Sequence, residues 1–264
     1  MKIGIFDSGL GGLTVARAIV HALPGYDMIY FGDTARTPYG SKSRETVIQY
    51  ACENTELLIK KGAELIVMAC NTAASVATEV LRQKYDLPIF EVITPAASMV
   101  ASFQKTRRVG IIGTRATINS NVYTDKISKD RPDIKVYAVP CPLLVPLVEE
   151  GWIDKPETRM IVKKYLHPLK VRQIDTLILA CTHYPILKSI IQKKIGRRVR
   201  VIDSAQEVAQ QLLLYFDEHN IVSEKDKPGN CQFFVSDITP FFEKIAQSIF
   251  KRQIPLEVAS TANF

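Results

Sequence analysis

The sequence predicts an α/β fold of two similar lobes, each a mostly parallel sheet flanked by helices, with a site in the cleft between the lobes. Short apolar runs alternate with longer segments of helical period, which is the order of elements in a parallel sheet covered by helices. The runs are apolar almost throughout, as expected of strands buried on both faces. One short motif recurs after two of them, which indicates two related halves.

The expected strands are short and rich in β-branched residues, and most are followed by a segment of helical period. They cover Lys2–Phe6, Asp27–Phe31, Glu64–Ala69, Pro88–Val92, Arg108–Gly113, Lys135–Val139, Asp175–Ala180, Val199–Ile202 and Cys231–Val235.

Two of the expected helices carry a start signal. Ser43 lies three residues before Thr46, and Ser204 lies three residues before Glu207, which is a capping box. The expected helices are Gly11–Ala22, Ser43–Lys61, Thr72–Tyr85, Arg115–Lys129, Pro156–Leu166, Pro185–Ile195 and Ser204–His219.

Two short internal sequence repeats, called echoes below, predict how the lobes divide the chain. Ala69-Cys70-Asn71-Thr72 matches Ala180-Cys181-Thr182-His183, and Asp7-Ser8-Gly9 matches Asp203-Ser204-Ala205. If the last helix and strands return to the first sheet, residues 1–94 and 207–264 form the first lobe and residues 95–206 form the second. The chain would cross between the lobes at Pro95 and just before the helix that starts at Ser204.

Composition excludes disordered and fibrous proteins, because 47% of the 264 residues are hydrophobic and 23% are charged. No run of about 18 apolar residues is present, and Asp7 stands where a secretory signal would still be apolar. We therefore expect a soluble, unprocessed, cytoplasmic protein with no membrane partner.

The chain carries 34 basic and 27 acidic residues, a formal net charge of +7. This balance suits a polyanion or a small acidic metabolite. The densest basic stretch, Lys193–Arg200, lacks aromatic residues and lies where a helix end should meet a strand. Cations at a helix C-terminus interact favourably with the helix macrodipole, so no ligand is needed to explain them. We favour a small molecule over nucleic acid as the partner.

The five cysteines are scattered and include no C-x-x-C pair, which argues against a disulfide framework and a structural zinc site. Cys70 and Cys181 each come directly after an expected strand and before an expected helix. The field of a helix N-terminus lowers the pKa of such a thiol from about 8.5 toward neutrality. Cys52, Cys141 and Cys231 lack this setting. Cys52, in the middle of an expected helix, and Cys231, at the start of an expected strand, are predicted to be small core residues or inert surface thiols.

A buried small residue is the ordinary role of a single cysteine at a strand end, but the recurrence favours chemistry. A nucleophilic pair of Cys181 and His183 would leave the other thiol unused. Two facing thiols suit a reaction that takes a proton from one face of a carbon and returns one to the other face, with thiolate as general base and thiol as general acid. Fixed donors at the helix N-termini would stabilise the developing carbanion.

The glycine-rich loop Phe6–Leu13 is neither a dinucleotide fingerprint nor a Walker loop, since Thr14 replaces the third glycine and no G-K-[ST] follows. Its backbone N–H groups suit a carboxylate or a phosphate. A tight turn capped by Asp7 or Ser8 explains the same residues, and both interpretations stay open.

Two further segments have polar side chains in loops. In Gly32–Gly40, hydroxyls, amides and Arg36 would grip an anionic side chain, or the segment is an irregular surface turn. The segment Pro142–Trp152 contains Glu149 and Glu150, which by themselves are explained as solvated charges at a helix end.

Five motifs taken together strongly resemble the glutamate racemase family. The resemblance runs in order through residues 1–205 and leaves the C-terminal segment unmatched. The motifs are Asp7-Ser8-Gly9-Leu10-Gly11-Gly12, Thr37-Pro38-Tyr39-Gly40, Ala69-Cys70-Asn71-Thr72-Ala73, Leu147-Val148-Glu149-Glu150-Gly151 and Ala180-Cys181-Thr182-His183-Tyr184-Pro185.

This resemblance implies interconversion of L- and D-glutamate with no cofactor and no metal, the D-isomer serving peptidoglycan synthesis. By similarity, Cys70 acts on one face of Cα and Cys181 on the other. Asp7 and His183 would assist the two thiols, and Glu149 would be a further acidic helper near His183. The residues expected to contact the substrate are Asp7, Ser8, Tyr39, Gly40, Asn71, Thr72, Thr182 and His183.

Three alternatives stay open. The nearest is an aspartate racemase of the same superfamily, although the loop around Tyr39 and Gly40 resembles that of the glutamate enzymes. The second is a noncatalytic two-lobe protein that binds a dicarboxylate, and the third is a regulatory protein that binds nucleic acid or a DNA enzyme through its basic surface. Some family members form homodimers or respond to a cell-wall precursor, and these residues do not decide either trait.

Overall fold

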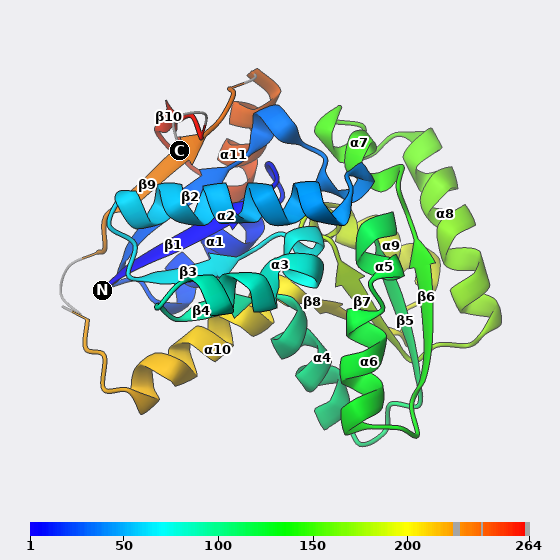
Figure 1. The fold of residues 1–264 in the computed structure, drawn as a ribbon. Coiled ribbons are helices and arrows are strands. Elements are labelled where there is room, and N and C mark those ends of the chain that lie inside the picture. Colours follow the sequence, from blue (N-terminus) through cyan, green and yellow to red (C-terminus); the bar gives the residue numbers. More distant parts are fainter. Residues whose placement is uncertain (224–227, 239, 262–264) are drawn as a thin grey trace.

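A computed structural model describes residues 1–223, 228–238 and 240–261 of the chain. It contains two sheets side by side, in which every strand pair among the described residues is parallel (Figure 1). The predicted α/β fold of two lobes is confirmed. The first sheet has the order β10-β9-β2-β1-β3-β4 and the second has the order β6-β5-β7-β8.

The predicted strands begin and end within one residue of their predicted limits. The first sheet comprises β1 (Lys2–Asp7), β2 (Asp27–Gly32), β3 (Leu65–Met68), β4 (Ile89–Glu91), β9 (Cys231–Val235) and β10 (Leu256–Val258). The second comprises β5 (Arg108–Gly113), β6 (Lys135–Pro140), β7 (Thr176–Ala180) and β8 (Arg200–Asp203).

Helices cover both sheets. Around the first sheet lie α1 (Leu13–Ala22), α2 (Arg44–Lys60), α3 (Asn71–Lys84), α10 (Ser204–Glu218) and α11 (Pro240–Phe250), with short 3₁₀ turns η1 (Thr34–Arg36) and η2 (Tyr39–Ser41). Around the second lie α4 (Ile93–Ser102), α5 (Arg115–Asn119), α6 (Val122–Asp130), α7 (Leu144–Glu149), α8 (Pro156–Val171) and α9 (Lys188–Ile195), with η3 (Tyr184–Leu187).

The chain passes between the sheets twice. After β4 it enters α4, which packs against α6, and after β8 it enters α10, which packs against both α1 and α4. Figure 1 shows α10 beneath the first lobe and α4 at the lower centre, next to α6. The residue limits predicted for the lobes, 94 and 207, stay a prediction.

Several elements differ from the expectation for local reasons. The predicted helix Arg115–Lys129 is two helices, because Asn121 adopts a left-handed conformation with φ 57° between them. Helix α4 is a further difference, because the sequence predicts only a crossing between the lobes at Pro95. A proline in the first turn is compatible with a helix, since the first N–H groups of a helix have no partner within it. Also unexpected are the short α7, α11 and β10, and the predicted helix from Pro185 begins as the 3₁₀ turn η3.

The two sheets share one strand order, since β2-β1-β3-β4 corresponds to β6-β5-β7-β8. Cys70 and Cys181 therefore follow equivalent strands, β3 and β7. The second echo is a chance match, because Asp7 ends the inner strand β1 whereas Asp203 ends the edge strand β8. By the register of the strands, the residue equivalent to Asp7 is Gly113, the last residue of β5, and Thr114 is equivalent to Ser8. Within the described residues, no helix is long and apolar enough to cross a membrane.

Packing of α2 onto the first sheet generates one prediction about stability. A Cβ on Gly4 would lie 2.7 Å from Ala63 Cβ and 3.0 Å from Ile66 Cδ1. Gly4→Ala should therefore lower the free energy of unfolding by about 1–3 kcal/mol through overpacking, measured by urea denaturation.

The compensating change Ala63→Gly is the control, since it removes the nearest atom. The loss of unfolding free energy in the double variant should be smaller than the sum of the two single losses by at least about 0.5 kcal/mol. Strict additivity of the two effects would contradict the close packing of Gly4 against Ala63.

Candidate active site

Both cysteines from the echoed motif open onto one cavity between the lobes. Cys70 stands between β3 and α3, and Cys181 directly follows β7. The cavity has a free volume of about 20 Å³. Its lining comprises Ser8, Pro38, Tyr39, Gly40, Cys70, Asn71, Thr72, Thr114, Val145, Cys181, Thr182 and His183.

The Cys70 thiol is buried, and its Sγ lies 3.5 Å from Ser8 Oγ, to which it donates a hydrogen bond. Burial and the negative charge of Asp7 raise the pKa of Cys70 to about 12, although Ser8 and the Ala73 N–H of the helix N-terminus act to lower it. The expected fall toward neutrality is therefore wrong for Cys70. Desolvation outweighs the helix field when the thiol is fully enclosed.

The Cys181 thiol lies beside an imidazole and a carboxylate. Cys181 Sγ is 3.8 Å from His183 Nδ1, and His183 Nε2 is 3.0 Å from Glu149 Oε1. The same oxygen accepts a hydrogen bond from Thr37 Oγ1 at 3.2 Å, so loop 33–40 of the first lobe closes over the helix end that carries Glu149. Glu149 is thus more than a solvated helix-end charge.

His183 is buried, and burial lowers its pKa, but hydrogen bonds and charge interactions with Cys181 and Glu149 outweigh that effect and raise the pKa to about 10. The imidazolium is therefore the stable form near neutral pH. This places a positive charge between the thiol of Cys181 and the carboxylate of Glu149.

Asp7 joins the lobes underneath the cavity. Its Oδ2 accepts hydrogen bonds from Gly9 N at 3.0 Å and Gly12 N at 2.9 Å, while Oδ1 accepts from Thr182 Oγ1 of the second lobe at 3.2 Å. Burial raises the pKa of Asp7, against the lowering effects of His183 and these donors. The loop is therefore both a capped turn and part of the site.

Two glycines allow the lobes to approach this closely. A Cβ on Gly11 would lie 2.5 Å from Thr182 Oγ1 and 2.7 Å from His183 Nδ1. A Cβ on Gly40 would lie 2.6 Å from Thr114 Cβ. Any side chain at either position would act as a wedge between the two halves of the site.

Residues of the second lobe hold the two residues that follow Cys70. Tyr123 OH donates to Asn71 Oδ1 at 2.7 Å, and Thr72 Oγ1 lies 2.9 Å from Thr114 Oγ1. Asn71 Nδ2 is the buried side-chain polar atom that lacks a hydrogen-bond partner among the described residues. A buried donor without a partner is costly, so this cavity suits a ligand with acceptor oxygens.

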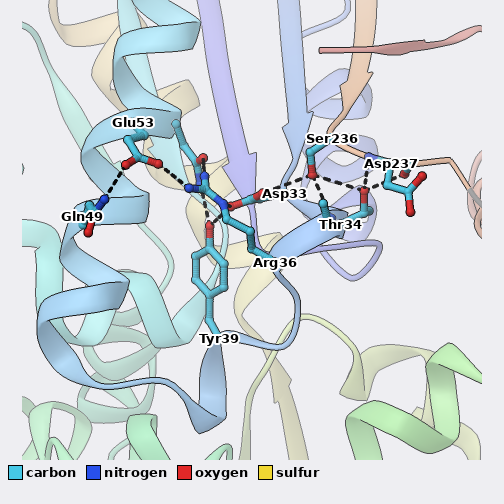
Figure 2. A network of polar contacts seen from close by, with 10 residues as sticks. Asp33, Thr34, Arg36, Tyr39, Gln49, Glu53, Ser236 and Asp237 are labelled. Atoms are coloured by element: carbon cyan, nitrogen blue, oxygen red, sulfur yellow. Dashed lines mark hydrogen bonds and ion pairs between the residues drawn. The ribbon is translucent and has the colours of Figure 1, made fainter. Parts of the chain in front are cut away.

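The loop after β2 is held by a network of polar contacts rather than left free to bind a ligand (Figure 2). Asp33 accepts hydrogen bonds from Arg36 Nε at 2.7 Å, from Tyr39 OH and from Ser236 Oγ at 3.1 Å. Arg36 also pairs with Glu53 and donates to Asn54, and its guanidinium lies over the Tyr50 ring. The prediction that Arg36 grips an anionic side chain is therefore wrong, whereas Tyr39 and Gly40 do line the cavity.

The structure brings together all of the predicted site residues, with Asp7 and Glu149 just behind the cavity wall. Glu149 lines a separate cavity of about 400 Å³ with Gly9, Leu10, Thr34, Thr37, Glu150 and Phe242. Sequence reasoning missed Pro38, Thr114 and Val145. Thr114 could have been found from the equivalence of β5 and β1; Val145 offers no such signal.

Cys141 also differs from expectation. It directly follows β6, so it does stand at a strand end, and its carbonyl accepts from Tyr184 OH at 2.9 Å. Its burial raises its pKa, and it lies outside the cavity lining. Within the described part of the chain, no group of three or more His, Cys, Asp or Glu residues is arranged to hold a metal ion.

Comparison with known proteins gives one consistent result. Residues 3–212 match the Asp/Glu/Hydantoin racemase family. A glutamate racemase of Persephonella marina is 46% identical over 257 residues, which cover 97% of this chain and 96% of that protein. The chain belongs to this family.

Solved structures agree with this assignment. The crystal structure of glutamate racemase from Francisella tularensis in complex with D-glutamate has a TM-score of 0.92 and 36% identity, covering 100% of this chain and 98% of that one. The Escherichia coli glutamate racemase in complex with L-glutamate and the activator UDP-MurNAc-ala has a TM-score of 0.79 and 27% identity, with 98% of each chain covered.

The His183–Glu149 pair generates a prediction about pKa. Glu149→Gln removes the negative charge but keeps an acceptor, so the pKa of His183 should fall from about 10. Titration of isotope-labelled histidine by NMR measures this, with the signals of histidines 21, 167 and 219 as the internal reference. An unchanged His183 titration would contradict the pairing.

The same shift predicts a stability change with pH. Because the folded-state pKa of His183 lies above its ordinary value of 6.5, its contribution to stability is fully present below pH 6.5 and is lost as the pH rises through about 10. The wild-type protein should therefore lose more stability than Glu149→Gln across this range in urea denaturation.

Proposed function

We propose that this chain is a glutamate racemase that interconverts L- and D-glutamate by two-base proton transfer at Cα without a cofactor. The observation that carries the proposal is the pair of thiols, Cys70 and Cys181, which reach one cavity from equivalent strand ends of opposite lobes. Family membership supports the same activity, since the curated relatives at 40–46% identity are glutamate racemases.

In the proposed reaction, one thiolate removes the α-proton, so that the C–H bond breaks, an S–H bond forms and the electron pair stays on Cα. The opposite thiol then gives its proton to the other face, which leaves a thiolate there. Cys70 serves one face and Cys181 the other. Returning the protons to their starting positions completes the cycle without an external reagent.

The two sides of the site would prepare their thiols differently. On the Cys181 side, His183 and Glu149 supply a charged imidazole–carboxylate pair. On the Cys70 side, the raised pKa makes the thiolate a strong base, which a weak carbon acid requires. Asp7, whose negative charge contributes to that raised pKa, is the residue proposed to assist Cys70.

Donors around the cavity would hold the substrate carboxylates. Ser8, Asn71, Thr72 and Thr182 line the cavity from both lobes, and Tyr39 and Gly40 line it from loop 33–40. Glutamate needs far more room than about 20 Å³, so we propose that the lobes part to admit it and close over it.

The wider setting of the reaction follows from the relatives. We propose that the enzyme works in the cytoplasm and supplies D-glutamate for peptidoglycan. The activator-bound Escherichia coli enzyme supports a cell-wall precursor as a regulator of this chain, and a homodimer stays a proposal.

The deciding experiment follows L-glutamate in D₂O by circular dichroism and NMR, with no cofactor added. Loss of optical activity with deuterium appearing at Cα is the expected result. Larger kcat/KM with aspartate would favour the aspartate racemase instead, and glutamate binding without any exchange, even with a cell-wall precursor present, would favour a noncatalytic binding protein.

Single cysteine variants test the two-base assignment. Cys70→Ala and Cys181→Ala should each lower racemisation by about 10²–10⁴-fold, because general acid–base catalysis contributes on that order. Each variant should stop α-proton abstraction from one enantiomer only, measured as deuterium exchange of L- and D-glutamate separately.

Cys52→Ala is the matched control, since Cys52 is a half-buried thiol on α2 outside the cavity lining. Its turnover should equal that of the wild type. Intact racemisation in either Cys70→Ala or Cys181→Ala would refute the two-base mechanism.

A further inference from the structure

Tyr123 is a buried tyrosine that no part of the proposed mechanism uses. It lies on α6 of the second lobe, is 2% exposed, and donates its hydroxyl across the lobe boundary to Asn71 Oδ1 at 2.7 Å. It is outside the lining of the cavity, whereas Asn71 is part of it. Any effect of Tyr123 on a ligand must therefore pass through Asn71.

The oxygen and the nitrogen of the Asn71 side-chain amide differ in their hydrogen bonding. Its oxygen accepts from Tyr123, and its Nδ2 lacks a partner among the described residues although Asn71 is only 2% exposed. An amide nitrogen donates two hydrogen bonds, and a carboxylate is an acceptor-only group. The unpaired end therefore suits a substrate carboxylate.

We propose that Tyr123 is a positioning residue that orients the Asn71 amide so that Nδ2 donates to a carboxylate oxygen of the substrate. This inference rests on the proposed racemase function and deepens it. Without the hydroxyl, the amide is free to turn and present Oδ1 to the cavity, where one acceptor would face another.

A neighbouring contact between the lobes also holds a residue of the cavity in place. Thr72 lies 2.9 Å from Thr114 Oγ1, and Thr114 lies 3.0 Å from Thr117 Oγ1, so hydroxyls of the second lobe also hold the residue after Asn71. The two residues that follow Cys70 thus reach their binding geometry only when the lobes are together. Parting of the lobes would release both at once.

Tyr123→Phe tests the proposal because it removes the hydroxyl and keeps the ring. We expect KM for glutamate to rise about 3–10-fold, the loss of one neutral hydrogen bond, while kcat changes less than twofold. Because L- and D-glutamate have equal free energies in water, kcat/KM should fall by the same factor in both directions.

Tyr85→Phe is the matched control. Tyr85 is the C-cap residue of α3, the helix that begins with Asn71, and its hydroxyl donates to Glu56 Oε1 at 2.7 Å. It lies outside the cavity lining. This variant should lose stability without any change in KM, which separates positioning from a purely structural role.

A double-variant cycle gives the sharper test. Tyr123→Phe should raise KM in the wild type and have no further effect in Asn71→Ala, because the group that it orients is then gone. Asn71→Asp keeps the acceptor for the Tyr123 hydroxyl but loses the N–H donor, so it should bind glutamate at least about tenfold more weakly. This variant keeps the proposal testable if Tyr123→Phe does not fold.

Two results would overturn the inference: a KM in Tyr123→Phe equal to that of an active wild type, or wild-type affinity in Asn71→Asp. Failure of the wild type itself to racemise glutamate would instead overturn the proposed function. The two failures are therefore distinguishable.

Discussion

The buried carboxylate of Asp7 holds the site together, because it is bonded to both lobes at the point where the two thiols meet one cavity. Its partners are the backbone of its own glycine-rich turn and Thr182 of the second lobe. The contact requires that the lobes nearly touch. Glycines at positions 11 and 40 allow this approach, since a Cβ at either would lie within 2.6 Å of the other lobe.

Enclosure between the lobes also determines the electrostatics. The two thiols occupy equivalent places in their sheets, yet their surroundings differ: Cys70 faces a hydroxyl and a negative charge, whereas Cys181 faces an imidazole backed by a carboxylate. In the proposed reaction the two enantiomers have equal free energies in water, and this equality does not require the two thiols to have the same neighbours.

The C-terminal segment contributes to the site although it lies beyond residues 3–212, which match the family. Strand β9 pairs with β2, so its end reaches the loop that follows β2. There Ser236 donates to Asp33 and accepts from Ala35 N, and Asp237 exchanges hydrogen bonds with Thr34 (Figure 2). The loop that presents Tyr39 is thereby fixed from both sides, by Asp33 and Arg36 within it and by β9 outside it.

By itself the sequence determined the α/β class, most strand and helix positions, both thiols and the set of residues around them. These depend on local periodicity and on motifs a few residues long, which survive without knowledge of the fold. Tertiary structure decided the partners of Arg36, the pKa of Cys70, the nonequivalence of Asp7 and Asp203, and the contact of Tyr123 with Asn71. Each of these depends on groups distant in sequence and on exclusion of water, and charge pairing and desolvation are properties of an enclosed volume rather than of a segment.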